Sequence, residues 1–389
     1  MNVKKKKRRP LSAHLLPILF MLPFGAIFGF FLGRYTEEFF DQGRPFHEII
    51  FAAALLFFIL YFIILIQIIL HEGGHLIFGL LTGYRFSSFR IGSFMWIKEE
   101  DSIKLKRFAL AGTGGQCLMA PPDYNNGNFP YLLYNMGGPI MNLIVFVLFG
   151  GISFYTKDYI PVSAFFFVSA IMSLMISLMN GLPLKLDLVN NDGYNALSLG
   201  KNKENLRSFW IQMKLGELST KGVPAKDMPE EWFVMPSPES LKNGMNAFLA
   251  VICCSKMIEE KKFDEAEETI SRLLLMDTAI AGLHRSMMAA DGIYCRLVGT
   301  DITKDPLELM DKQQKKMMKI MRHSLSIQRT EYALALLLEQ NEEKAGKIEK
   351  TFEKTVKNYP YQADIIIERE LLEFAKQRYE GKKNEASRH

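Results

Sequence analysis

Long, nearly uninterrupted runs of apolar residues dominate the first half of the chain. They cover residues 15–32, 49–70, 132–155 and 161–184, and the second run continues beyond residue 70 to Leu81. A helix of about 20 apolar residues spans the hydrocarbon core of a bilayer. A soluble protein would rarely contain four such runs, so the pattern predicts a polytopic membrane protein with about four transmembrane helices.

Positive charges indicate how these spans are oriented. Six consecutive basic residues, residues 4–9, precede the first run, and six more lie between residues 84 and 130. Lys and Arg concentrate on the cytoplasmic side of membrane proteins, so we expect a multi-pass protein of the cell membrane with both termini in the cytoplasm. The first run also resembles a signal peptide, but Gly33, Arg34 and Tyr35 do not form a small-residue cleavage site, which favours a retained anchor.

The segment Phe86–Phe108 lies between the second and third runs and is too polar to be a span. Its apolar residues, such as Phe89 and Trp96, alternate in part with small and polar ones, and residues 98–102 resemble a turn. This pattern predicts a small β-hairpin. The glycine-rich residues 111–115 that follow predict a flexible loop.

The second half is rich in Lys, Glu and Gln and shows helical periodicity. Prolines at positions 224, 229, 236 and 238 suggest a linker before it. The fold class is therefore mostly α, with a basic N-terminus at 1–13, a membrane domain at 14–200, a linker region at 201–235 and a soluble helical domain at 236–380. Residues 263–277 resemble a tetratricopeptide-type helix pair, so this domain serves either partner recognition or packing alone.

The overall composition is informative only when the two halves of the chain are considered separately. The 49% of hydrophobic residues is an average over an apolar and a polar half, and the net charge of +5 mixes both signs, which gives no support to nucleic-acid binding. The four cysteines have no metal-binding or disulfide spacing, so we expect reduced thiols.

A candidate metal site lies at the end of the second run, in the sequence His71-Glu72-Gly73-Gly74-His75. Residues four apart share one face of a helix, so both imidazoles can bind one zinc ion. Zinc lowers the pKa of a bound water to about 7, and Glu72 stands where a general base is needed. The alternative is a pair of interfacial histidines, but ionisable groups within an apolar span are expensive and usually functional.

A hydrolytic zinc site needs a third protein ligand. The end of the fourth run, residues 180–193, offers Asp187 and Asp192. A carboxylate from either one would complete a site of two histidines and one acid, and either one is also explained as a solvated acid or a helix cap at the membrane surface.

Three motifs in succession resemble the site-2 protease family of intramembrane zinc metalloproteases, in particular a bacterial-type member with a cytosolic helical C-terminal domain. They are residues 71–75, Gly138-Pro139-Ile140-Met141-Asn142, and Asn180…Pro183…Asp192-Gly193, and the resemblance covers about 49–197. It implies that His71, His75 and Asp192 bind zinc. It also implies that Asn180 binds the substrate strand or the oxyanion, that Asn142 supports the site, and that the β-hairpin predicted at Phe86–Phe108 is membrane-associated.

One feature departs from that family's pattern. Its Leu-Asp-Gly follows the proline closely, whereas here Leu186-Asp187 has that spacing without the glycine, and Asp192-Gly193 lies nine residues after Pro183. We favour Asp192, because a glycine lets the backbone approach a metal closely.

The expected function is that of a zinc-dependent intramembrane endopeptidase, which hydrolyses peptide bonds of membrane-anchored proteins or peptides. Its partners would be that substrate and the lipid bilayer. The alternatives are a metal transporter and a non-catalytic membrane scaffold of the same fold. Transporters distribute polar groups along a path through the bilayer, whereas the ionisable residues here cluster at one end of the spans. The presence of Glu72 argues against the scaffold.

Overall fold

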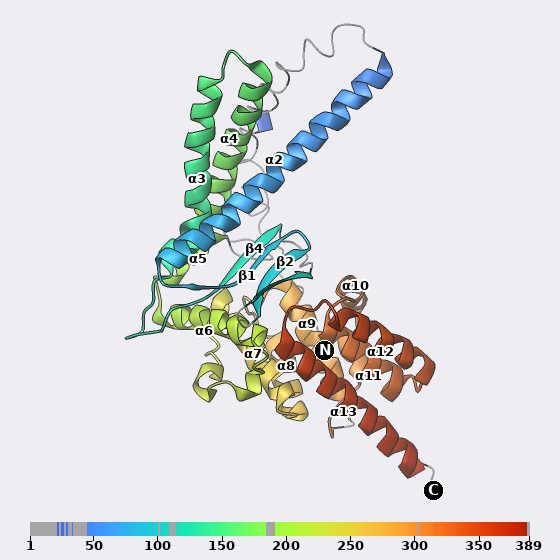
Figure 1. Cartoon of the computed structure of the whole chain (residues 1–389). Helices are drawn as coiled ribbons and strands as arrows, with labels where there is room; N and C mark the ends of the chain where they lie inside the picture. Colours follow the sequence, from blue (N-terminus) through green and yellow to red (C-terminus); the bar gives the residue numbers. More distant parts are fainter. Residues whose placement is uncertain are drawn as a thin grey trace. The chain divides into compact units, whose positions relative to one another are not determined.

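The computed structural model describes residues 45–99, 102–108, 114–183, 191–301 and 303–386, together with the single positions 22, 25, 26, 29 and 33. This part of the chain is mostly helical, with one small antiparallel sheet (Figure 1). The basic N-terminus, most of the span predicted at residues 15–32, the candidate ligand Asp187 and residues 111–113 lie outside it.

The four strands are consecutive in the sequence and lie between helices α2 and α3. The strands are β1 Arg85–Ile91, β2 Phe94–Glu99, β3 Ser102–Arg107 and β4 Gly115–Ala120. The α-helices are α2 Phe46–Leu81, α3 Leu132–Tyr155, α4 Ile160–Gly181, α5 Asp192–Leu199, α6 Lys203–Thr220, α7 Gly244–Glu259, α8 Phe263–Leu275, α9 Gly282–Val298, α10 Lys312–Ile320, α11 Leu325–Ala333, α12 Glu342–Val356 and α13 Gln362–Ala386. Five short helical turns complete them: η1 Ala225–Asp227, η2 Glu230–Phe233, η3 Ser240–Lys242, η4 Pro306–Leu309 and the π-helical η5 Leu334–Leu338.

Three of the helices in the described part, α2, α3 and α4, are long and apolar enough to cross a membrane. They coincide with the second, third and fourth predicted runs, so the prediction of three long apolar helices at these positions is confirmed. Large apolar side chains along them remain exposed, including Phe57 at 74% and Phe154 at 78%. Such surfaces are stable against lipid rather than water.

The chain divides into two compact units, the first of which contains α2 up to Gly74, α3 from Gly137, and α4. Small polar side chains hold the helices of this unit together. The hydroxyl of Ser177 donates to the carbonyl oxygen of Pro139 at 2.8 Å, and Ser153 bonds to Ser163 between α3 and α4. Lipid supplies no hydrophobic force between helices, so small residues and interhelical hydrogen bonds take over that role.

The second unit contains the sheet, whose strand order is β3-β2-β1-β4 with all pairs antiparallel. Glu99 at the end of β2 pairs with Ser102 at the start of β3, and residues 100 and 101 of the turn predicted at 98–102 lie outside the described residues. The segment Phe86–Phe108 contributes to three strands, whereas a two-stranded hairpin was predicted. A fourth strand, β4, starts at Gly115, at the end of the loop predicted to be flexible, and pairs with β1. β1 buries residues of both faces, which removes the alternation that would have marked it.

Helices α5 to α13 form the rest of the second unit. Residues 203–220, in the segment assigned to a linker, form α6, which packs against β4 and α7. Further along, α8 packs on α9, and α11 packs on α9, α12 and α13 around a core that includes Ile270, Ile293 and Phe352. The unit thus joins the sheet to a helical array by a continuous run of packed helices.

Adjacent glycines on α2 have opposite surroundings. A methyl group added at Gly74 would collide with the carbonyl oxygen of Gly137 and lie 2.6 Å from Cβ of Met141, whereas one added at Gly73 would meet nothing within 4 Å. Gly74 is therefore required for the close approach of α3 to α2, and Gly73 is not.

We expect Gly74→Ala to destabilise the protein by about 1–3 kcal/mol, because the collision involves backbone and forces the helices apart. Gly73→Ala is the matched control, and it should be neutral or stabilising, since alanine favours a helix by about 1 kcal/mol over glycine. The measurement is the thermal unfolding midpoint of both variants in the same detergent. Equal midpoints would show that α3 does not approach α2 at Gly74.

Candidate metal centre

The apolar sequence of α2 places two histidines one helical turn apart within a single unbroken helix. His71 and His75 are 9% and 8% exposed, although both side chains are polar. Buried imidazoles need hydrogen-bond partners, and each histidine has one for its Nδ1 atom.

The partner of His75 is a backbone carbonyl. Its Nδ1 lies 2.8 Å from the carbonyl oxygen of Tyr134, at the start of α3. A carbonyl oxygen only accepts, so Nδ1 of His75 carries the hydrogen, and in the neutral imidazole Nε2 keeps its lone pair. Tyr134 is itself fixed by its hydroxyl, which donates to the carbonyl oxygen of Cys117 in β4 at 2.8 Å.

Tyr84 adds an aromatic wall to this region. Its ring stacks on that of Tyr134 with centroids 4.7 Å apart, and Tyr134 in turn lies 5.8 Å from the His75 ring. Burial raises the pKa of the Tyr84 phenol, which therefore stays neutral at physiological pH. The carbonyl of Tyr134 is thus held by packing against Tyr84 as well as by the strand.

Asp192 is placed opposite His75 by the helix that it begins. Asn191 is the N-cap of α5, and its side-chain oxygen accepts a hydrogen bond from the backbone N–H of Tyr194 at 2.9 Å. Asp192 is the next residue, and its Oδ2 lies 3.4 Å from Nε2 of His75. A carboxylate in the first helical turn is also favoured by the helix dipole.

The partner of His71 is an amide from the neighbouring helix. Its Nδ1 lies 2.7 Å from Oδ1 of Asn142, which is fully buried in α3. This contact assigns the hydrogen to Nδ1 and leaves the lone pair on Nε2, as for His75. Asn142 thus contacts a candidate ligand, as expected for a residue that supports the site.

His71, His75 and Asp192 form a group in which each residue offers one ligand atom, and these atoms all lie within 4.8 Å of one another. The lone pair of neutral His75 faces a carboxylate oxygen, an arrangement that is repulsive unless a proton or a metal ion lies between them. Two imidazole nitrogens and one carboxylate, each imidazole held at its other nitrogen, are the donor set of a catalytic zinc site. The residues present therefore fit a zinc ion.

The two remaining predicted site residues lie beside this group in sequence or at the end of α4. Glu72 is half-buried on α2, directly after His71. Asn180 is near the end of α4, where its amide nitrogen donates to the carbonyl oxygen of Ile176 one turn earlier, at 3.1 Å.

Sequence reasoning missed two contributors to the geometry. The carbonyl of Tyr134 gave no signal, because any residue could supply it. Gln67 is fully buried and accepts a hydrogen bond from Asn142 at 3.2 Å. Its signal was available, since Gln67 is an isolated amide within an apolar run and lies one helical turn before His71.

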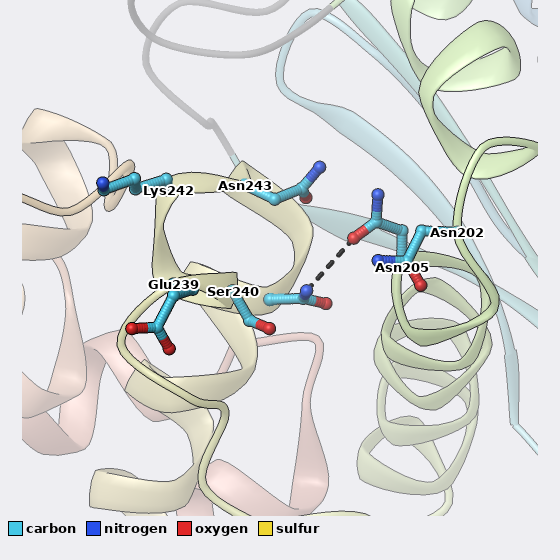
Figure 2. Close-up of a pocket in the computed structure, with 7 residues that line it drawn as sticks. Asn202, Asn205, Glu239, Ser240, Lys242 and Asn243 are labelled. Carbon is cyan, nitrogen blue, oxygen red and sulfur yellow. Dashed lines mark hydrogen bonds between the residues drawn. The ribbon is translucent and has the colours of Figure 1, made fainter.

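A separate polar pocket lies in the second unit, with a volume of about 420 Å³ (Figure 2). Its lining is Asn202, Asn205, Glu239, Ser240, Lys242, Asn243 and Asn246. Asn202 and Asn243 are the N-caps of α6 and α7, and Asn246 donates to Asn205. These four amides already have partners, two of them as helix caps and two in a hydrogen bond with each other.

Comparison with known proteins agrees with the membrane part of the chain. A family model described as Peptidase M50B-like matches residues 48–190. The resemblance to the site-2 protease family is thereby confirmed for this segment, and the family suggests a membrane metalloprotease. The matched segment contains His71, Glu72, His75 and Asp187 and ends just before Asp192. Comparisons with curated proteins and with solved structures gave no match.

The cap on α5 generates a prediction about metal binding. We expect Asn191→Ala to weaken zinc binding about fivefold, because losing an N-cap costs about 1 kcal/mol and releases the turn that orients Asp192. Asn191→Ser keeps an oxygen acceptor at the cap and should bind zinc nearly as tightly as the wild type. Competition with a chromophoric chelator measures both affinities. Equal losses of zinc affinity in the two variants would show that the hydrogen-bond acceptor at the N-cap does not determine zinc binding.

Proposed function

We propose that the protein is a zinc-dependent intramembrane endopeptidase that hydrolyses peptide bonds of membrane-anchored proteins or peptides. The observation that carries the proposal is the group of His71, His75 and Asp192, in which each histidine has Nδ1 engaged by an acceptor. Such engagement leaves Nε2 as the metal-binding atom. The match to the Peptidase M50B-like family supports the same reaction class.

The position of the histidines along α2 suits cleavage near one membrane surface. α2 has 36 residues, whereas about 20 suffice to cross the hydrocarbon core. Counted from Ile49, the hydrocarbon core would end near Ile68, so His71 and His75 would lie just beyond the core, at the opposite interface. Water reaches such a depth, and a transmembrane substrate must locally unwind to expose a peptide bond there.

In the proposed mechanism, the side chains of this chain bind, orient and move protons. His71, His75 and Asp192 would hold zinc, which when bound polarises the scissile carbonyl and acidifies water. Glu72 takes a proton from the attacking water and then delivers it to the leaving amine, so that the carboxylate is regenerated. Asn180 donates to the substrate strand or to the oxyanion, after its amide turns away from Ile176.

The sheet supports the proposal that this segment associates with the membrane. Trp96 of β2 and Leu105 of β3 are paired neighbours and are 39% and 57% exposed. Phe94 and Ile103 are exposed on the same two strands, where the cross-strand partner of Phe94 is Arg107 and that of Ile103 is Lys98. Aromatic rings flanked by basic residues are typical of a surface that sits at a membrane interface.

The proposed topology is multi-pass, with about four spans and both termini in the cytoplasm, as the Lys and Arg residues predict. The helical array at the C-terminal end would then lie in the cytosol. Protease accessibility of a C-terminal tag in sealed right-side-out and inverted vesicles tests this arrangement, and cleavage of the tag in right-side-out vesicles would refute it.

The first test is cleavage of a model single-span peptide by the purified wild type, Glu72→Ala and Glu72→Gln, with zinc content measured on each. We expect cleavage by the wild type, a loss of at least about 100-fold in both variants, and unchanged zinc, because Glu72 transfers a proton without binding the metal.

Three other outcomes contradict parts of this expectation. Persistent cleavage by a zinc-loaded Glu72→Gln variant would show that Glu72 is not the base. A wild type that neither binds zinc nor cleaves would favour a non-catalytic scaffold. Zinc uptake into vesicles that contain the wild-type protein would favour the transporter.

The identity of the third ligand is a separate prediction. We propose Asp192, because its carboxylate lies next to His75, although Asp187 has the family's spacing from Pro183. Asp192→Ala should lower zinc affinity by several orders of magnitude, and the matched control Asp187→Ala should leave it unchanged. The opposite result would assign the ligand to Asp187 and leave the reaction class intact.

A further inference from the structure

A chain of buried polar groups connects the three helices of the first unit to His71. Gln67 on α2, Asn142 on α3 and Ser173 on α4 are fully buried, and Ser169 on α4 is nearly so. The Nε2 atom of Gln67 donates to the backbone carbonyl oxygen of Ser169 at 3.2 Å. The Nδ2 atom of Asn142 donates to Oε1 of Gln67, also at 3.2 Å, and Oδ1 of Asn142 meets His71.

The direction of every hydrogen bond in this series follows from its last acceptor, the backbone carbonyl oxygen of Ser169. The carbonyl of Ser169 can only accept, so Gln67 must present its NH₂ group there and its oxygen to Asn142. Asn142 must then present its NH₂ group to Gln67 and its oxygen to His71. His71 in turn must carry its hydrogen on Nδ1, which leaves the Nε2 lone pair for a metal.

Ser173 reinforces the same orientation of Asn142. Its hydroxyl donates to the backbone carbonyl oxygen of Asn142 at 2.8 Å, so its oxygen remains an acceptor. That oxygen lies 3.4 Å from Nδ2 of Asn142, on the same side as Gln67. The amide therefore faces acceptors on one side, which disfavours a flip that would turn Nδ2 towards His71.

We propose that Gln67 is a positioning residue for the metal centre: through Asn142 it selects the His71 tautomer that binds the metal through Nε2. The inference rests on the proposed function, since it concerns the same centre. Without the acceptor on Gln67, Asn142 loses the hydrogen bond that most favours the orientation with its oxygen towards His71. A flipped Asn142 would donate to Nδ1 and move the hydrogen of His71 to Nε2, where it blocks metal binding.

The experiment is a double-mutant cycle on zinc affinity in the full-length protein. Gln67→Met keeps the length of the side chain and removes its acceptor. Asn142→Asp replaces the amide by a carboxylate, which presents an acceptor to His71 in either orientation. We expect Gln67→Met alone to weaken zinc binding by about 10- to 100-fold, as for other groups that orient a ligand. In the Asn142→Asp background, Oε1 of Gln67 would face a carboxylate oxygen, so the same substitution should cause no loss of zinc affinity.

A merely structural role of Gln67 predicts a different result, namely equal losses of zinc affinity in both backgrounds, and that result would overturn the inference. If Asn142→Asp does not fold, the cycle is repeated with Asn142→Ala, which keeps all three candidate metal ligands. Gln67→Met should then cause no additional loss of zinc affinity, because Gln67 acts through Asn142, whereas a further loss would overturn the inference.

The control for general disruption is Ser153→Ala, which removes a buried bond between α3 and α4 that does not reach His71. It should leave zinc affinity unchanged, and an equal loss there would also overturn the inference. Failure of the proposed function is distinguishable, because the wild type itself would then bind no zinc or would bind it without cleaving the model peptide.

Discussion

The hydrogen bond at Nδ1 of each histidine is the interaction on which the rest of the centre depends. An imidazole has two nitrogens, and only the one without hydrogen can bind a metal. His75 is set by the carbonyl of Tyr134 and His71 by the amide of Asn142. Each acceptor is delivered by α3, so the start of that helix must stay close to α2. The close approach at Gly74 and the hydroxyl anchor of Tyr134 on β4 both serve this geometry.

Polar groups among apolar helices carry a large desolvation cost, and the first unit offsets that cost by pairing them. Gln67, Asn142 and Ser173 are all fully buried, and each has a hydrogen-bond partner. A partly satisfied network would be worse than an apolar interface, because an unpaired polar group keeps its full desolvation penalty. Because every member of the network has a hydrogen-bond partner, the network has a single preferred arrangement. That rigidity is useful beside a metal centre, where ligand orientation matters more than helix stability.

The sequence predicted the apolar helices and the histidine motif well, because both rest on local patterns of the required period. The sheet was predicted only as a hairpin, since β4 pairs with β1 across 24 or more residues and β1 is buried on both faces. The backbone carbonyl of Tyr134 could not be predicted, because it depends on tertiary placement and on no side chain. Gln67 was readable as an isolated amide in an apolar run, but its partners came from two other helices. The assignment of Asp192 over Asp187 drew on Gly193 alone, and the contact with His75 adds a geometric reason.

The balance of charge around the motif supports a divalent cation independently of the distances. Neutral histidines contribute no charge, Asp192 contributes one negative charge, and Glu72 contributes a second one beside His71. Two carboxylates at the edge of an apolar helix repel one another and lose hydration, so they are costly without a compensating cation. A divalent ion would balance two negative charges, whereas a proton shared between His75 and Asp192 would balance one. In the proposed mechanism, such an ion would also acidify the water that Glu72 deprotonates, so the same balance of charge would favour both the stability of the centre and its chemistry.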